Sequence, residues 1–342
     1  MKKALITGIT GQDGSYLAEF LLSKDYEVHG IVRPAATPNT SRINHILPKL
    51  KIHRGDLADS NSIISVIKDV KPDEVYNLAA QSNVGISIDM PEYSSDITAL
   101  GTTRLLEIIR HYSPDSKFYQ ASSSEMFGEA MAPQNEDTPF RPLSPYACSK
   151  LYAYWMTINY RDAYNLFGVN GVLFNHESAR RGEIFVTRKI TMAIANILAG
   201  KQDILILGAL NAYRDWGFAP EYVECMWKML QQDKPDDYAI GIGETHTVRD
   251  FLFVAFKYAG LDVSEHVSIE MNQFGSRGAK VLKADTAKAQ RILGWNPRIK
   301  FEKLVKIMVD ADIRALAKQY KHSWDGDAII RDLFPDKWWE GD

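Results

Sequence analysis

A glycine-rich turn near the N-terminus stands between a short apolar run and an amphipathic segment. The run at 4–6 (ALI) predicts a buried strand, and residues 14–22 predict the helix that follows it. The turn at 7–14 reads TGITGQDG, with the glycine spacing G-x-x-G-x-x-G. Glycines let a backbone turn tightly and approach a pyrophosphate, whose charge is stabilised by the helix N-terminus. The turn therefore predicts a phosphate cradle for a dinucleotide; the alternative is an ordinary glycine-rich turn.

The first half of the chain alternates predicted strands with predicted helices. Further strands are expected at 27–32, 51–53, 74–77 and 117–121, and further helices at 60–69 and 102–111. Strands separated by helices form βαβ units, which build a parallel sheet with helices on both faces. The predicted fold class is α/β, a Rossmann-like doubly wound parallel sheet with a smaller C-terminal α/β substrate-binding domain.

The regular alternation loosens after residue 174, which marks the expected domain boundary. A helix at 146–167 precedes it, and the elements beyond it are a strand at 204–206 and helices at 221–231 and 301–320. We expect a dinucleotide-binding domain at 1–174 and a mainly substrate-binding domain at 175–342. Later segments can return to the first domain.

Composition limits the partners that the chain can have. The formal net charge of -3 gives no electrostatic reason to expect nucleic acid, despite a local basic cluster at 180–189. The two cysteines, Cys148 and Cys225, form no metal-like pair, so we expect no metal and a reducing compartment. The N-terminal apolar run is too short for a signal peptide, and no segment approaches a transmembrane span. These features predict a cytoplasmic protein with no membrane or nucleic-acid partner.

The end of the second predicted strand bears on which dinucleotide binds. A carboxylate there would hydrogen-bond the ribose 2′-hydroxyl of NAD, whereas an arginine accommodates the 2′-phosphate of NADP. Residues 30–34 read GIVRP, with Arg33 where a carboxylate would stand and with Arg42 nearby. This favours NADP. NAD is not excluded, because Arg33 could instead stack on the adenine or face solvent.

A tyrosine, a lysine and a serine form a candidate catalytic group. Tyr146 and Lys150, in the run YACSK, lie one helical turn apart on one face of a predicted helix. A nearby ammonium lowers the pKa of a phenol, so Tyr146 could act as a base near neutral pH. Ser123, at the end of a predicted strand, could complete the relay to a substrate oxygen. Tyrosine–lysine pairs at this spacing are common on solvated helices, and their combination with the glycine turn favours catalysis.

Several longer runs resemble one enzyme family over nearly the whole chain. They are ITGITGQDGSYLAEFLL from Ile6, DEVYNLAAQS from Asp73, KFYQASSSEMFG from Lys117, SPYACSK from Ser144, LFNHES from Leu173, RRGEIFVTRKIT from Arg180 and RDWGFAPEYVE from Arg214. The chain is similar to the extended short-chain dehydrogenase/reductases (the NAD-dependent epimerase/dehydratase family), and within them to the GDP-mannose 4,6-dehydratases. This implies a hydro-lyase of deoxysugar biosynthesis that uses bound NADP and acts on a nucleoside diphosphate sugar, GDP-mannose above all. It also implies a homodimer or homotetramer, and a nucleotide-sugar-binding role for residues 175–342.

The resemblance assigns roles to individual residues. The implied catalytic residues are Ser123, Glu125, Tyr146 and Lys150. The implied cofactor-binding residues are Gly8, Thr10, Gly11, Gln12, Asp13, Gly14, Arg33, Asp56, Leu57, Leu78, Ala79, Ala80, Tyr146, Lys150, His176 and Arg181. The implied substrate-binding residues are Ser82, Ser123, Glu125, Asn175, Val186, Lys189, Arg214 and Arg277, and no metal is implied. Arg214 is the expected diphosphate clamp, because the fork of a guanidinium suits phosphate oxygens. In related enzymes, the segment at 180–188 contributes to cofactor contacts across a subunit interface.

Glu125 distinguishes water loss from the other reactions of this superfamily. A ketone at C4 of a sugar acidifies the C5 proton, and in the resembling family a carboxylate at this position removes it. The implied mechanism has Tyr146 take the 4-hydroxyl proton as hydride passes to NADP; water then leaves from C6, and the hydride returns to C6. If Glu125 only interacts with a helix dipole, the chain would be a 4-epimerase or 4-reductase. A nicotinamide-sensing regulatory protein is the non-catalytic alternative.

Three positions depart from the family pattern. Residues 275–278 read GSRG where the family has R-P-x-E, so Arg277 is displaced and the glutamate is missing. Residues 33–35 read RPA in place of RRS, and Ala179 replaces the proline of N-H-E-S-P. The catalytic residues are intact, so we expect the chemistry to be retained. The sugar stays open, and a GDP-heptose or another nucleoside diphosphate hexose would also fit.

Overall fold

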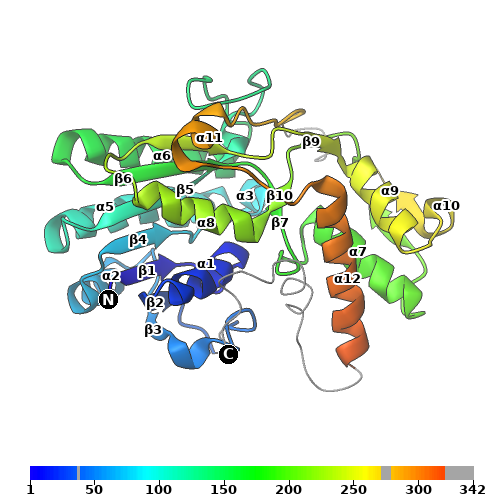
Figure 1. Cartoon of the computed structure of the whole chain (residues 1–342), viewed down its shortest axis with the longest axis horizontal. Coiled ribbons are helices and arrows are strands. Elements are labelled where there is room, and N and C mark those ends of the chain that lie inside the picture. Colours follow the sequence, from blue (N-terminus) through cyan, green and yellow to red (C-terminus); the bar gives the residue numbers. More distant parts are fainter. Residues whose placement is uncertain (37–38, 271–278, 320–342) are drawn as a thin grey trace.

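A seven-stranded parallel sheet forms the centre of the molecule (Figure 1). The computed structural model describes residues 1–36, 39–270 and 279–319. The strands are β1 (Lys3–Thr7), β2 (Glu27–Val32), β3 (Lys51–Arg54), β4 (Glu74–Asn77), β5 (Lys117–Ser123), β6 (Gly168–Leu173) and β11 (Asp237–Ile240). Their order is β11-β6-β5-β4-β1-β2-β3, and each pairing between them is parallel. This is the strand order of a Rossmann-like sheet extended by one strand, which confirms the predicted fold class.

Helices cover both faces of this sheet, as the alternation of strands and helices predicts. They are α1 (Gln12–Ser23) and α8 (Ala219–Leu230), which pack together on one face, and α2 (Ser60–Val70), α5 (Gly101–Tyr112) and α6 (Pro145–Tyr164) on the other. Successive residues of β1 pack in turn against the helices on the two faces of the sheet. Ala4 and Ile6 join the apolar cluster that contains α1 and α8, whereas Leu5 joins the cluster under α2 and α5. Side chains alternate across a strand, so a strand buried on both faces is apolar throughout.

Specific residues set the two ends of α6, which carries two of the predicted catalytic residues. At its start, the Ser144 hydroxyl accepts a backbone hydrogen bond at 3.1 Å, and Pro145 occupies the first turn, where no N–H is needed. The sequence predicts a helix to about residue 167, but α6 ends at Tyr164. The difference arises because Asn165 adopts a left-handed conformation with a φ of 56°, which turns the chain toward β6.

A second group of helices packs beside the sheet, at the right of Figure 1. It consists of α7 (Val186–Leu198), α9 (Val248–Tyr258) and α12 (Phe301–Gln319). The chain returns from this side to the sheet, since β11 and α8 follow residue 175 and yet belong to the sheet layers. We therefore propose that the division at residue 174 holds for the main parts of two domains, with β11 and α8 assigned to the first.

Short elements complete the described part of the chain. They are η1 (Leu47–Lys49), α3 (Val84–Asp89), α4 (Pro91–Ser95), η2 (Asp96–Leu100), η3 (Ser124–Met126), β7 (His176–Glu177), β8 (Leu205–Leu207), β9 (Tyr213–Arg214), β10 (Gly217–Phe218), β12 (His246–Thr247), α10 (Val263–His266), β13 (Val267–Ile269) and α11 (Ala287–Leu293). Within the described ranges, no helix has both the length and the apolarity needed to cross a bilayer.

Candidate active site

A cavity of about 1100 Å³ opens at the carboxyl ends of β1, β4, β5 and β6. Ligands of open parallel sheets bind in this position, and the volume exceeds the range of roughly 300–1000 Å³ common for one small ligand. The predicted site residues that line it are Gly8, Thr10, Gly11, Gln12, Asp13, Gly14, Arg33, Asp56, Leu57, Leu78, Ala79, Ala80, Ser82, Ser123, Glu125, Tyr146, Lys150, Asn175, His176, Arg181 and Val186. Lys189 is exposed and does not line the cavity. Arg214 does not line it either, but forms an ion pair with Glu125, which does. Arg277 lies outside the described residues.

The turn after β1 leaves its backbone open to the cavity. Gly8 adopts a φ of 71°, and a Cβ there would lie 2.9 Å from the backbone nitrogen of Ala79. Gly11 donates its N–H to the Gly8 carbonyl at 2.9 Å, and a Cβ on Gly14 would lie 2.3 Å from that same oxygen. The turn can close in this form only with glycine at positions 8 and 14, and the N-terminus of α1 follows directly. These residues fit a dinucleotide pyrophosphate.

Replacing Gly14 with Ala should lower the free energy of unfolding by about 1–3 kcal/mol, because the clash is with backbone that cannot move aside. Dinucleotide affinity should fall too, since the turn must shift. Denaturant unfolding and dinucleotide titration measure the two effects. Gly168→Ala is the matched control: its Cβ would meet the Thr157 methyl group at 3.1 Å, away from the cavity, so the affinity should hold. Equal losses of affinity in both variants would contradict the role of the turn.

Ser123, Tyr146 and Lys150 meet where β5 ends and α6 begins. The Ser123 hydroxyl lies near enough to Tyr146 to lower the pKa of the phenol. Lys150 Nζ donates to the carbonyl of Ala121 at 2.6 Å and lies 5.9 Å from the centroid of the Tyr146 ring. A backbone carbonyl thus holds the ammonium beside the phenol.

Burial dominates the ionisation of this pair. It raises the pKa of Tyr146 to about 12, although the Ser123 hydroxyl lowers it; the charge of Glu125 raises it further. Burial also lowers the pKa of Lys150 to about 8, so the ammonium form still predominates at neutral pH. The predicted lowering of the Tyr146 pKa is therefore wrong for this chain, because loss of solvation outweighs the Ser123 hydroxyl and the charge of Arg181.

Glu125 stands in the 3-10 turn η3, directly after β5. Its backbone N–H donates to the Ser123 hydroxyl at 3.2 Å, and the residue lines the cavity together with Tyr146. Its Oε1 lies 3.6 Å from Nη2 of Arg214, and both side chains are largely buried. A carboxylate and a tyrosine–lysine pair thus share one cavity, an arrangement that can exchange two different protons with one substrate.

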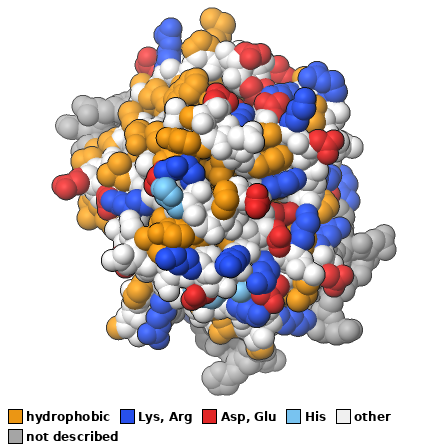
Figure 2. All heavy atoms as spheres, turned by 90° about the vertical axis from the view of Figure 1, so that its left-hand side faces the viewer, with side chains coloured by type: hydrophobic (Ala, Val, Ile, Leu, Met, Phe, Trp, Pro, Cys, Tyr) orange, Lys and Arg blue, Asp and Glu red, His pale blue; other side chains and the backbone are white. Residues whose placement is uncertain are grey.

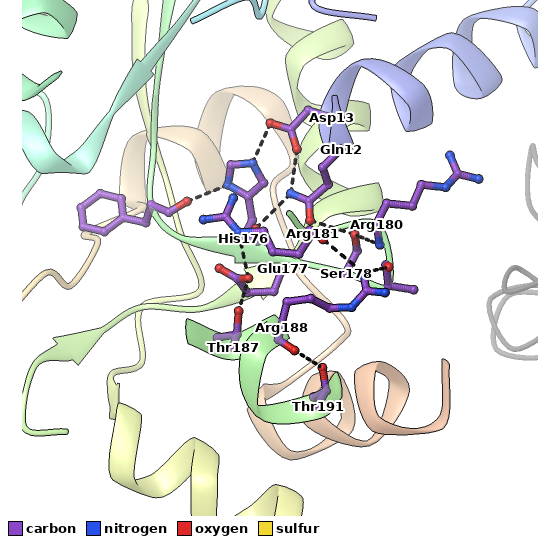
Figure 3. A network of polar contacts seen from close by, with 12 residues as sticks. Gln12, Asp13, His176, Glu177, Ser178, Arg180, Arg181, Thr187, Arg188 and Thr191 are labelled. Atoms are coloured by element: carbon purple, nitrogen blue, oxygen red, sulfur yellow. Dashed lines mark hydrogen bonds and ion pairs between the residues drawn. The ribbon is translucent and has the colours of Figure 1, made fainter. Parts of the chain in front are cut away.

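The polar run at 175–178 (NHES) binds to the glycine turn from the other side of the cavity (Figure 3). His176 Nε2 lies 2.8 Å from Asp13 Oδ2, and its Nδ1 donates to a backbone carbonyl at 2.8 Å. Gln12 donates to the His176 carbonyl at 3.1 Å and accepts from the Ser178 hydroxyl at 2.8 Å. Three predicted cofactor residues therefore hold one another in place. Ser178 was not among the predicted site residues, although its position in the polar run NHES could have indicated that it belongs to the site.

The His176–Asp13 pair should make stability depend on pH. Burial alone would lower the pKa of His176, but the Asp13 carboxylate and the hydrogen bonds raise it above 6.5. A raised histidine pKa stabilises the folded state below 6.5, and this contribution is lost as the pH rises through the raised value. Thermal unfolding should therefore show a decline above neutral pH that His176→Gln removes. The same decline in the variant would contradict this origin.

The basic cluster predicted at 180–189 is divided among different surroundings (Figure 3). Arg180 is buried, with Nη2 2.6 Å from Glu19 Oε1 in α1. Arg188 is also buried, and its Nη2 lies 2.6 Å from Oδ1 of Asp312 in α12. Arg181 is the one member of the cluster that lines the cavity. Arg180 and Arg188 therefore connect elements of the fold.

The chain is similar to known proteins over almost its full length. A family model described as GDP-mannose 4,6 dehydratase matches residues 5–308. GDP-mannose 4,6 dehydratase 1 of Arabidopsis thaliana is 54% identical over 332 residues, which cover 94% of this chain and 92% of that protein. GDP-mannose 4,6 dehydratase of Homo sapiens is 48% identical and covers 92% of each chain. The solved structure of DesIV, a dTDP-glucose 4,6-dehydratase of Streptomyces venezuelae with NAD and TYD bound, has a TM-score of 0.82 at 22% identity, covers 93% of this chain and 98% of that chain, and shows the same fold.

Proposed function

The chain belongs to the GDP-mannose 4,6-dehydratase family, and we propose that it removes water from GDP-mannose. The product is GDP-4-keto-6-deoxymannose, formed with internal hydride transfer through a bound nicotinamide cofactor. The observation that carries this proposal is the placement of Glu125 beside Ser123, Tyr146 and Lys150 in the cavity bordered by the glycine turn.

The cavity residues divide the chemistry between two proton acceptors. Tyr146, which lies near Ser123 and beside Lys150, takes the proton of the sugar 4-hydroxyl. The C4 ketone acidifies C5, and Glu125 takes the C5 proton. Glu125 then gives this proton to the 6-hydroxyl, which leaves as water, so one carboxyl serves both halves of the elimination. A nicotinamide cofactor held at the glycine turn would supply an acceptor for the C4 hydride and a donor that returns it to C6, and the positive charge of its oxidised form would favour the Tyr146 phenolate. Addition of a proton at C5 completes the product and balances the proton that Tyr146 removed from the 4-hydroxyl.

NADP is the proposed cofactor because two arginines line the cavity beyond β2. Arg33 donates from Nη1 to the Tyr93 hydroxyl at 2.8 Å, and Arg42 donates from Nε to the Arg180 carbonyl at 2.8 Å. Residues 33–36 read RPAA, so no carboxylate stands where the ribose 2′-hydroxyl of NAD would be bound.

Arg42→Ala should weaken NADP binding by about tenfold or more, because a charged hydrogen bond to the 2′-phosphate is lost. NAD binding should change by no more than about twofold, since NAD lacks that phosphate. Parallel titrations with the two dinucleotides measure the ratio. If both affinities fall together, Arg42 supports the fold of the site and does not select NADP.

The nucleotide sugar is proposed to lie beyond the catalytic group, where Ser82, Asn175 and Val186 line the cavity. Residues 275–278 depart from the family pattern in sequence, and they lie outside the described residues. Their departure favours one second candidate, the same chemistry on a GDP-heptose or another nucleoside diphosphate hexose.

A homodimer or homotetramer is proposed from the exposed faces of α5 and α6. Tyr112 on α5 and Tyr152, Trp155 and Tyr164 on α6 are each at least 40% exposed. Figure 2 views the side where these helices lie in Figure 1, and hydrophobic side chains gather in its upper part. Large apolar side chains on neighbouring helices suit a two-fold interface. Sedimentation should show an oligomer that Trp155→Glu dissociates; a monomeric parent chain would contradict the proposal.

Incubation with a panel of nucleotide sugars, followed by NMR of the products, tests the function. A 4-keto-6-deoxy product from GDP-mannose without added reductant is the expected result. A 4-keto-6-deoxy product from a GDP-heptose, with no reaction of GDP-mannose, would identify the GDP-heptose as the substrate. Inversion at C4 with the 6-hydroxyl retained would make the chain a 4-epimerase, and dinucleotide binding without any turnover would make it a sensor.

A further inference from the structure

The ion pair between Arg214 and Glu125 joins the expected diphosphate clamp to the expected C5 base. Nη2 of Arg214 lies 3.6 Å from Oε1 of Glu125, and only 14% and 19% of the two side chains are exposed. This distance allows charge attraction but exceeds that of a good N–H···O hydrogen bond, about 2.7–3.2 Å. Nη1 instead donates to the carbonyls of Ala279 at 2.8 Å and Tyr213 at 3.0 Å. One side of the guanidinium is thus anchored on backbone, while Nη2 faces Glu125 without a full hydrogen bond.

The backbone that carries Arg214 is held firmly in place. In β9, Arg214 pairs with His246 of the antiparallel strand β12. The next residue, Asp215, is fully buried and accepts three backbone N–H groups at 2.7, 2.8 and 3.1 Å. Since the backbone is fixed, a new negative charge near Nη2 can be met only by a movement of the Arg214 side chain. Such a movement changes the distance to Glu125.

We propose that Glu125 and the substrate diphosphate compete for Nη2 of Arg214. The proposal rests on the proposed function and on the sequence-based expectation that Arg214 clamps the diphosphate. Phosphate oxygens carry more negative charge than one carboxylate and match the guanidinium fork, so nucleotide binding draws Nη2 away from Glu125. The Glu125 carboxylate is then released from its ion pair with Arg214. Arg214 is thus a positioning residue that releases the C5 base when the nucleotide is bound.

Binding of GDP alone tests this competition, because GDP carries the diphosphate but lacks the mannosyl group that Glu125 would touch. Glu125→Gln removes the competing charge and keeps the side-chain shape, so GDP should bind about two- to tenfold tighter. Arg214→Met should weaken GDP binding by about tenfold or more, and Arg214→Lys should restore part of the loss. In the Arg214→Met background, Glu125→Gln should have no further effect, because the coupling runs through Arg214. Calorimetric titration of the cofactor-loaded variants measures all four affinities.

Glu129→Gln is the matched control, since Glu129 is exposed on the same segment and should leave GDP affinity unchanged. If Glu125→Gln does not tighten GDP binding while Arg214→Met weakens it, Arg214 is a clamp without coupling and the proposal is overturned. If Arg214→Met leaves GDP binding intact, Arg214 only supports Glu125, which also overturns it. The titration needs no turnover. A chain that shows this binding pattern but forms no keto sugar would refute the proposed function alone.

Discussion

Glu125→Gln is expected to lower the rate of GDP-mannose dehydration by about 10²–10⁴-fold. Glutamine keeps the shape of the side chain but can neither accept the C5 proton nor deliver it to the 6-hydroxyl. Tyr146 keeps its place near Ser123, and Lys150 keeps its hydrogen bond to the Ala121 carbonyl, so oxidation at C4 should continue. The variant should therefore stop with the sugar oxidised and the nicotinamide reduced.

Three measurements on one sample separate these steps. The near-ultraviolet absorbance of reduced nicotinamide should rise on mixing with GDP-mannose. NMR should detect neither deuterium exchange at C5 nor the 4-keto-6-deoxy product. Glu129→Gln removes an exposed carboxylate four residues away and should behave as the parent chain does. Dehydration at the parent rate in Glu125→Gln would show that the carboxylate is incidental.

Five of the seven strands of the central sheet could be predicted because their signals are local, whereas β6 and β11 were not predicted. Strand β1 is apolar at each of residues 4–6, as a strand buried on both faces must be, and the glycines at 8–14 mark the turn to α1. Strand β11 (Asp237–Ile240) could not be recognised in the same way. It is short, and it joins the sheet beside β6 through a pairing between distant parts of the sequence. The pattern of residues within one strand does not indicate which distant strand it pairs with.

The members of the site could be named from motifs, but their contacts could not. The pairs Asp13–His176 and Glu125–Arg214 each join segments far apart in the chain. The ionisation of Tyr146 depends on how completely the fold buries it, which a Tyr–Lys spacing does not reveal. For the same reason, the basic cluster at 180–189 divides into buried structural arginines and one cavity residue only in three dimensions.

Tyr146→Phe is expected to reduce turnover by about 10⁴-fold, at the upper end of the range for general acid–base catalysis. Without the phenol, the 4-hydroxyl keeps its proton and the C4 ketone does not form. The C5 proton then stays unacidified, so Glu125 has nothing to remove, and both proton transfers are lost through one hydroxyl. Phe keeps the ring at this largely buried position, so the variant should fold.

The contrast with Glu125→Gln identifies the order of the steps. Tyr146→Phe should show neither reduction of the nicotinamide nor deuterium exchange at C5, whereas Glu125→Gln should show the first without the second. Tyr152→Phe is the matched control: it makes the same change in α6, but its hydroxyl accepts a hydrogen bond from Thr103 at 3.2 Å and lies outside the cavity. Nicotinamide reduction at the parent rate in Tyr146→Phe would mean that another group takes the 4-hydroxyl proton. Since Ser123 lines the cavity near Tyr146, the double variant Ser123→Ala/Tyr146→Phe would then show whether that group is Ser123.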